Sequence, residues 1–212
     1  MIYLFLILLL KYQPYSDFTS MTTKEIVQIV KDITNENIET INASVGKMSE
    51  KQLNWIPNPG IWSVAQVLAH LNEYGRYYYP TFERKIENTR FRSTKEAFIS
   101  SPLGRSAWKS MKLGNANNVK RKFRAQKGYN PAIETSLVTG DDLAIFLDQQ
   151  KSFLSIIEKA QEVNFRRVKI PISISKIVRL RLGDALLFVA YHNQRHVQQI
   201  KNLIANPNFP KK

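Results

Sequence analysis

Apolar residues recur along four stretches of the chain with the three- and four-residue spacing of amphipathic helices. These stretches run from Thr22 to about Met48, from Ser63 to about Ile86, from about Asp141 to Val163 and from about Gly183 to Ala205. The spacing places the apolar side chains on one face of each helix, where a neighbouring helix can bury them. Four such faces predict an all-α protein built as a four-helix bundle.

Polar residues at the start of two stretches support these boundaries. Thr22 and Glu25, and likewise Ser63 and Gln66, have the spacing of a capping box, in which two side chains satisfy backbone N–H groups at a helix start. Pro80 lies inside the second stretch, so we expect it to end or kink the helix before helix resumes.

The connection between the second and third helices is long. Residues 91–131 are rich in Ser, Asn, Gly and basic residues. A structureless loop of this length is unusual in a compact domain, so we expect short helical pieces within it, such as Thr94 to Ile99. Thr139 is then the expected cap of the third helix, and a basic connection containing Pro171 leads to the fourth. No convincing run of residues predicts β-strands.

The N-terminal residues form a separate segment. Ile2 to Leu10 is an apolar run, far shorter than the roughly 20 residues with which a helix spans a bilayer. Residues 1–21 are therefore interpreted as an extension outside the domain, or as an export signal or lipid-facing anchor. Residues 22–205 form the bundle domain and 206–212 a C-terminal tail. We expect no membrane span and a cytoplasmic location, or export if residues 1–20 act as a signal.

Composition restricts the chemistry that this chain can perform. It contains no cysteine, which excludes disulfides, thiolate zinc sites and cysteine nucleophiles, so a metal must be bound by imidazole or carboxylate. The formal net charge is +14, which raises the question of an anionic partner. The excess is concentrated in residues 91–131 and 165–181 rather than along one helix face.

One part of this basic excess is typical of a nucleic-acid contact surface. Phosphate-binding cations alternate there with aromatic residues on which bases could stack: Lys120, Arg121, Lys122, Phe123, Arg124, Lys127 and Tyr129. No recognised nucleic-acid-binding motif accompanies them, and a basic loop is usually a solvated surface. Nucleic-acid binding is kept as an alternative, and no specific nucleic-acid partner is expected.

The only three histidines of the chain are the main candidates for a site. His192 and His196 are four residues apart, so both rings project from one face of the fourth helix and interrupt its apolar stripe. Buried imidazoles need partners for their nitrogens, and a metal ion can satisfy one nitrogen of each. His70 lies near the middle of the second helix, so all three rings can converge if the two helices are neighbours. Taken alone, each histidine is more typical of a solvated or hydrogen-bonded position than of a metal ligand.

Two segments carry a resemblance to a known family. Residues 60–71 read GIWSVAQVLAHL, and residues 182–200 read LGDALLFVAYHNQRHVQQI. They resemble the Trp-Ser…His-Leu and His-x-x-Arg-His-x-x-Gln segments of the DinB/YfiT-like superfamily of metal-binding four-helix bundles, in which such segments supply three histidine ligands. The resemblance covers about residues 22–205. It implies that His70, His192 and His196 bind one divalent metal ion.

The resemblance also implies a topology and a range of activities. The bundle would be up-down-down-up, with a long crossover between helices two and three, and the ion would be zinc or nickel. Three neutral imidazoles leave a coordination position open, as in catalytic rather than structural zinc sites. Such a centre can activate water or a low-molecular-weight thiol, so hydrolase and thiol S-transferase are both possible activities, with a small-molecule substrate. A metal-binding bundle without catalysis, and a homodimer or a monomer, stay open.

Other residues near the predicted ligands have no firm role. Glu73 follows His70 by one turn and is either a partner of a ligand or a solvated charge, the second being favoured. Gln199 could bond a bound group or pack at the core edge. Trp62 is interpreted as a hydrophobic staple rather than a substrate platform. The triplet Tyr77–Tyr79 could line a pocket but is more typical of core and surface positions.

Overall fold

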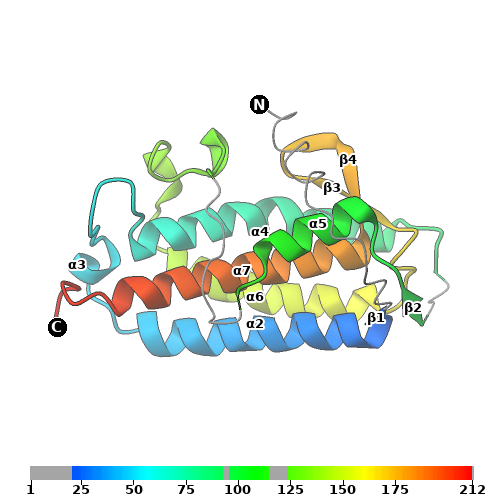
Figure 1. Ribbon diagram of the computed structural model, residues 1–212, viewed down its shortest axis with the longest axis horizontal. Helices are drawn as coiled ribbons and strands as arrows, with labels where there is room; N and C mark the ends of the chain where they lie inside the picture. Colours follow the sequence, from blue (N-terminus) through cyan, green and yellow to red (C-terminus); the bar gives the residue numbers. More distant parts are fainter. Residues whose placement is uncertain (1–20, 93–95, 115–123, 212) are drawn as a thin grey trace.

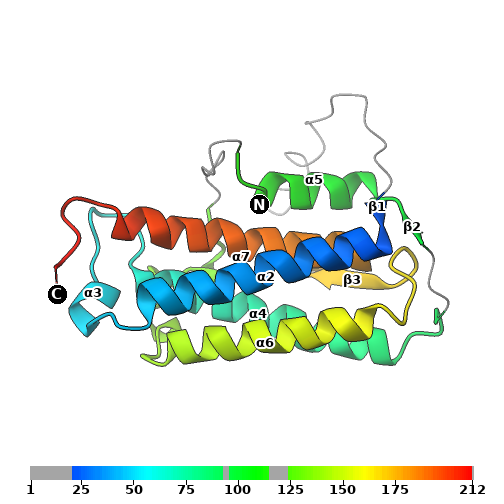
Figure 2. The same ribbon diagram turned by 90° about the horizontal axis from the view of Figure 1, so that it is seen from below.

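The computed structural model describes residues 21–92, 96–114 and 124–211. Its four long helices are α2 (Thr23–Val45), α4 (Val64–Glu87), α6 (Asp142–Ala160) and α7 (Leu182–Ile204). Helices α2 and α7 run in one direction and α4 and α6 in the other (Figures 1 and 2). The predicted four-helix bundle with up-down-down-up topology is therefore confirmed, and α4 and α7 are antiparallel neighbours.

The core of the bundle is divided along its length. One apolar cluster includes Phe82 and Phe153, and a second, nearer the other end, includes Ile41 and Phe146. Where the two clusters meet, the helices carry buried polar side chains, namely His70 and Asn72 on α4, Gln150 on α6, and His192 and Asn193 on α7. A buried polar layer must be satisfied internally, and most of these groups hydrogen-bond one another or neighbouring backbone.

The helix starts predicted from sequence are present. Both capping boxes form, with the Thr22 and Ser63 hydroxyls accepting from the backbone N–H three residues on. Helix α4 continues through Pro80 to Glu87, so Pro80 does not end it. The Thr81 hydroxyl donates to the carbonyl of Tyr77 at 2.7 Å, which adds a bond in the turn where proline lacks its N–H.

The start of α6 differs from prediction, and the start of α7 lacks a side-chain cap. Thr139 does not cap α6; its own N–H donates to Asp142 Oδ2 at 2.9 Å, and the N-cap position is Asp141. Helix α7 begins without a side-chain cap because strand β4 leads directly into it. Its first N–H groups are satisfied instead by backbone carbonyls, with Leu182 N–H donating to Val168 at 3.0 Å.

The expectation that the chain forms no strands is wrong. Strands β3 (Lys169–Ile172) and β4 (Ser175–Arg181) form an antiparallel hairpin before α7. Strands β1 (Met21–Thr22) and β2 (Ala97–Phe98) form a second, two-residue pair. Apolar residues alternate with others from Ile170 onward, a period-two pattern typical of strands. Pro171 weakens that signal, since proline is tolerated only where a strand needs no N–H.

The crossover contains short helical pieces as expected, but not at the predicted place. Of the predicted piece from Thr94 to Ile99, Ala97–Phe98 is strand β2, and the residues up to 95 lie outside the described ranges. The helix of this connection is α5 (Pro102–Met111), which lies along α7 (Figure 2). Short helical turns follow at η1 (Lys127–Tyr129) and η2 (Thr135–Leu137), and α3 (Glu50–Leu53) lies between α2 and α4.

The C-terminal residues lie against α3. Gln52 Nε2 donates to the carbonyl of Pro210 at 3.0 Å, and the rings of Trp55 and Phe209 meet edge to face. None of the described helices has the length and hydropathy required to cross a bilayer. The predictions for residues 1–20 concern a segment outside the described ranges.

A buried carboxylate fixes α5 against α7. Asp184, in the first turn of α7, has no exposed surface, and its Oδ2 accepts from the backbone N–H and the hydroxyl of Ser101, both at 3.0 Å. The Ser101 hydroxyl in turn accepts from Gly104 N–H at 3.0 Å as the cap of α5. Burial raises the pKa of Asp184, while these hydrogen bonds oppose the rise. Glycine at position 104 allows this close approach.

Replacing Gly104 with alanine tests this contact. A Cβ at position 104 would lie 2.6 Å from the Cβ of Asp184, too close for either backbone to stay in place. In a helix, alanine is normally more stable than glycine by about 1 kcal/mol. A loss of stability on this substitution would therefore come from the clash and not from helix propensity. Gly104→Ala is expected to lower the free energy of unfolding in urea by about 1–3 kcal/mol.

Gly128→Ala is the matched control, because a Cβ there meets nothing within 4 Å. It should change the free energy of unfolding by less than about 0.5 kcal/mol. A Gly104→Ala protein as stable as the original would contradict the close packing of α5 on α7.

Candidate metal centre

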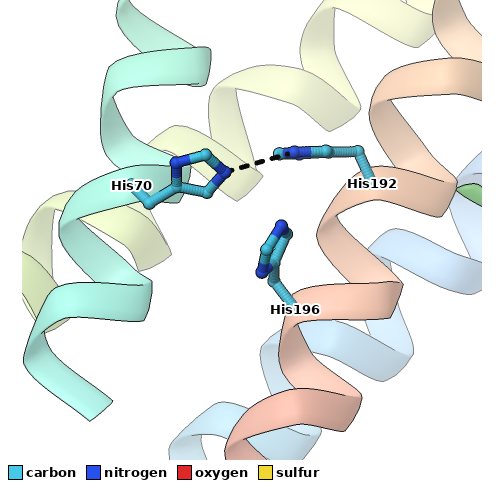
Figure 3. Close-up of side chains that lie close together, drawn as sticks. All are labelled: His70, His192 and His196. Carbon is cyan, nitrogen blue, oxygen red and sulfur yellow. Dashed lines mark hydrogen bonds between the residues drawn. The ribbon is translucent and has the colours of Figure 1, made fainter. Parts of the chain in front are cut away.

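The three histidine rings meet in the space between α4 and α7 (Figure 3). His70 projects from α4, and His192 and His196 project from successive turns of α7. One ring nitrogen from each lies within 4.8 Å of the others, and the Nε2 atoms of His70 and His192 are 3.4 Å apart. The structure therefore brings together the three candidate ligands identified in the sequence.

Hydrogen bonds fix the tautomers of two rings. His70 Nδ1 lies 2.5 Å from the backbone carbonyl of Tyr129, which can only accept, so Nδ1 carries the proton. His196 Nδ1 lies 2.9 Å from Gln199 Oε1 and donates to it in the same way. In both rings Nε2 is therefore unprotonated and carries the lone pair, which in His70 accepts from His192 Nε2 at 3.4 Å. This arrangement, with the far nitrogen donating to a carbonyl, is the usual setting of a histidine metal ligand.

His192 is held by stacking on two aromatic rings and by a hydrogen bond between its Nε2 and Nε2 of His70 at 3.4 Å. Its ring stacks with Tyr74 at 4.1 Å and with Phe188 at 5.9 Å between centroids. Its Nδ1 is buried and has no hydrogen-bond partner in the described part of the chain. A buried nitrogen without a partner costs about 1–3 kcal/mol. The ring is kept in this position by its aromatic neighbours, with its Nε2 directed at His70.

Electrostatics keep all three rings neutral near pH 7. Burial lowers the pKa of His70 to about 4, although the Tyr129 carbonyl opposes this change. Burial also lowers the pKa of His192 and of His196 well below the usual value. Repulsion from the neighbouring histidines and from Arg195 lowers both further. A neutral imidazole has the free lone pair that a metal ligand needs.

One pair of these nitrogens has the spacing expected at a tetrahedral ion. Two ligands at the usual zinc–nitrogen distance of about 2.0–2.1 Å are about 3.4 Å apart in a tetrahedral site. The Nε2 atoms of His70 and His192 are 3.4 Å apart. No carboxylate joins the three histidines within the described part of the chain. The residues present are therefore a suitable three-nitrogen set, with room for further ligands.

Access to the rings is uneven. His70 and His192 are only 3% and 5% exposed, whereas His196 is partly accessible. The half-buried Trp62 covers part of this side, with its ring 4.9 Å from His70 and stacked at 6.2 Å on His196. Trp62 also packs against the apolar cluster around Ile41, as a staple would. It therefore has both a packing role and a position at the histidine cluster.

The remaining candidates occupy different places. Glu73 forms an ion pair with Arg76 one turn along α4 and makes no hydrogen bond to a histidine. Of the tyrosine triplet, Tyr79 is buried and bonded to Gln150, whereas the hydroxyl of Tyr77 donates to the carbonyl of Ile172 in the hairpin. Tyr78 is buried and lines a cavity. Tyr79 thus belongs to the core, Tyr77 contacts the hairpin, and Tyr78 lines the cavity.

The basic and aromatic residues predicted as a nucleic-acid contact surface lie only partly within the described residues. Lys120, Arg121, Lys122 and Phe123 lie outside the described residues. Tyr129, expected there as a stacking aromatic, instead packs its ring on Tyr74 at 4.8 Å while its carbonyl binds His70.

Sequence reasoning missed two residues of the site. Tyr74 lies one turn after His70 on the same helix face and contacts the rings of both His70 and His192. Its position could have been inferred from that spacing. The Tyr129 carbonyl could not, because a backbone group in a distant loop leaves no signal in the side-chain pattern.

Comparison with known proteins agrees with this architecture. A family model described as the DinB superfamily matches residues 34–200. The uncharacterized protein YuaE of Bacillus subtilis is 28% identical over 167 residues, which cover 78% of this chain and 91% of YuaE. The solved structure of YfiT from Bacillus subtilis, described as a probable metal-dependent hydrolase with an unusual four-helix bundle topology, matches with a TM-score of 0.52. That match is 15% identical and covers 90% of each chain, so it supports the fold.

The depressed histidine pKa values predict how stability changes with pH when no metal is present. His70 titrates near its usual pKa of about 6.5 when unfolded and at about 4 when folded. Above about pH 6.5 the ring is neutral in both states, so its titration does not change the stability. As the pH falls from there toward 4, the unfolded state takes up a proton that the folded state does not, and stability is lost. Each such histidine contributes up to about 1.4 kcal/mol per pH unit.

Urea unfolding in the presence of a chelator, between about pH 7 and about pH 5, measures this slope. His70→Gln, which cannot titrate, should unfold with a shallower pH dependence than the original protein. Gln198→Ala, on the same helix as two of the histidines but bonded only to Asn202, should keep the original slope. Equal slopes in the His70→Gln and original proteins would show that folding does not lower the pKa of His70.

Proposed function

This chain belongs to the DinB superfamily, and we propose that it is a metal-dependent enzyme in which His70, His192 and His196 bind one divalent ion, zinc or nickel. The observation that carries the proposal is the convergence of three neutral rings within 4.8 Å at the centre of the bundle. The hydrogen bonds to Tyr129 and Gln199, which leave two Nε2 atoms unprotonated, support it further. The description of YfiT as a probable metal-dependent hydrolase is consistent with it.

The ligand set favours catalysis over a structural role. Structural zinc sites are closed by four protein ligands, whereas a three-ligand site keeps a position for water or substrate. Three neutral imidazoles also leave the positive charge of the ion uncompensated. When bound, such an ion acts as a Lewis acid and lowers the pKa of a water or thiol at the open position. His196 is the partly accessible member of the set, which favours access for water or substrate from its side.

The residues around the ligands hold the rings in place and limit solvent. Tyr74 and Phe188 both stack on the ring of His192, and Trp62 packs on His196. Burial raises the pKa of Tyr74 to about 12, so its phenol stays protonated and can donate a hydrogen bond. A mostly apolar enclosure strengthens electrostatic interactions at the centre. These features suit activation of water, as in a hydrolase, and of a low-molecular-weight thiol, as in an S-transferase.

Metal content of purified protein and its variants tests the proposal. After exposure to zinc or nickel and dialysis, the original protein should retain about one equivalent of metal, and His192→Ala less than about a tenth. Gln199→Ala removes the acceptor for His196 Nδ1 and should weaken metal binding by about 10–100-fold, as loss of a partner of a ligand does. Inductively coupled plasma mass spectrometry and titration calorimetry measure these quantities.

Gln198→Ala is the control at the neighbouring position, since Gln198 bonds Asn202 and not a histidine. It should bind metal as the original protein does. Far-ultraviolet circular dichroism establishes that each variant is folded. Folded original protein that binds neither ion, or His192→Ala that binds as tightly as the original, would overturn the proposal.

A further inference from the structure

A second feature of the molecule lies beside the histidine cluster. It is a cavity between α4, α5, α7 and the β3–β4 hairpin, lined by Tyr74, Leu103, Ala107, Ile172, Val178 and Phe188 among others. Two of its walls, α5 and the hairpin, are the elements that the helical pattern of the sequence did not predict. Tyrosine hydroxyls hold the hairpin in place, since Tyr77 donates to the carbonyl of Ile172 and Tyr78 accepts from Ser173 N–H.

The lining of this cavity is suited to a hydrocarbon group. Its walls are aliphatic and aromatic side chains with few polar atoms, and no charged residue contributes to them. The free space is about 50 Å³, and one water-sized group takes roughly 10–15 Å³ of such space. The cavity therefore accommodates about three to five such groups, the size of a short aliphatic chain.

The cavity and the histidine cluster share two aromatic residues. Tyr74 and Phe188 line the cavity, and both stack on the ring of His192. Tyr74 also contacts His70, with 5.0 Å between ring centroids. The cavity therefore borders the histidine cluster, with the rings of Tyr74 and Phe188 as their shared wall.

We propose that this cavity binds the apolar part of the substrate, a short unbranched hydrocarbon chain, while the reacting polar group lies at the three histidines. The inference rests on the proposed function, because it assigns the cavity to the same substrate. It makes Leu103, Ala107 and Val178 the residues that select substrates by chain length. It also gives a function to α5 and the hairpin, which together build the cavity on the side of the bundle.

A series of alkyl hydroxamates tests the proposal on the zinc-loaded protein. The hydroxamate group chelates a divalent ion, and the alkyl chain extends from it toward the cavity. Each methylene moved from water to an apolar site improves binding by about fourfold. Pentanohydroxamate should therefore bind at least about tenfold more tightly than acetohydroxamate, as measured by titration calorimetry.

Two substitutions on one strand show where the chain binds. Val178→Trp fills the cavity, so this variant should bind pentanohydroxamate and acetohydroxamate about equally well. Its affinity for acetohydroxamate and for zinc should not change. Ile177→Trp adds the same side chain at the neighbouring position, which is 89% exposed, and should keep the preference. An equal loss in both variants, or no loss in Val178→Trp, would overturn the proposal.

Metal-free protein separates this proposal from the proposed function. Saturation-transfer NMR with 1-pentanol should detect binding to the original protein and Ile177→Trp but not to Val178→Trp. If zinc and hydroxamates fail to bind while this pentanol pattern is observed, the metal proposal fails and the apolar site stands. Zinc and acetohydroxamate could bind while pentanol does not bind and pentanohydroxamate binds no more tightly than acetohydroxamate. In that case the metal centre stands and the cavity proposal fails.

Discussion

Three imidazole rings that face one another in the interior of a bundle need an environment that holds each ring and keeps it neutral. A charge on any one ring would be stripped of water, and on His192 or His196 it would also be repelled by charged neighbours such as Arg195, so the pKa of each ring lies below its usual value. A neutral ring still requires a partner for each nitrogen. The Tyr129 carbonyl and the Gln199 amide supply one for His70 and His196, and the lone pairs that remain converge on a common point.

The rest of the molecule supports this arrangement. The antiparallel packing of α4 and α7 brings mid-helix positions opposite each other, and the polar layer separates two apolar clusters that fix the helices on either side. The crossover between α4 and α6 also supplies structural contacts to the rest of the molecule. It carries α5, fixed to α7 through Ser101 and Asp184, and the loop that presents the Tyr129 carbonyl to His70. The hairpin completes the enclosure from the side of Tyr74 and Phe188.

The bundle could be predicted because its information is local. Apolar spacing defines the four long helices, and the capping boxes at Thr22 and Ser63 define two of their starts. His192 and His196 could be placed on one face from their spacing alone, whereas bringing His70 to them required the helices to be neighbours, an expectation strengthened by family resemblance. The hairpin and α5 were missed because proline obscured one pattern and the basic composition suggested a loop. The contacts of Tyr129 and Asp184 depend on tertiary structure, which a spacing rule does not contain.

X-ray absorption spectroscopy of the zinc-loaded protein at the metal edge tests the central claim most directly, because it reports the number and type of the atoms bound. Three imidazole nitrogens at about 2.0–2.1 Å with at least one additional light-atom ligand is the result that the histidine geometry predicts. Zinc bound by one or no imidazole, or mainly by carboxylate oxygens, would contradict it. In that case the three buried rings of His70, His192 and His196 would serve the packing of the bundle alone.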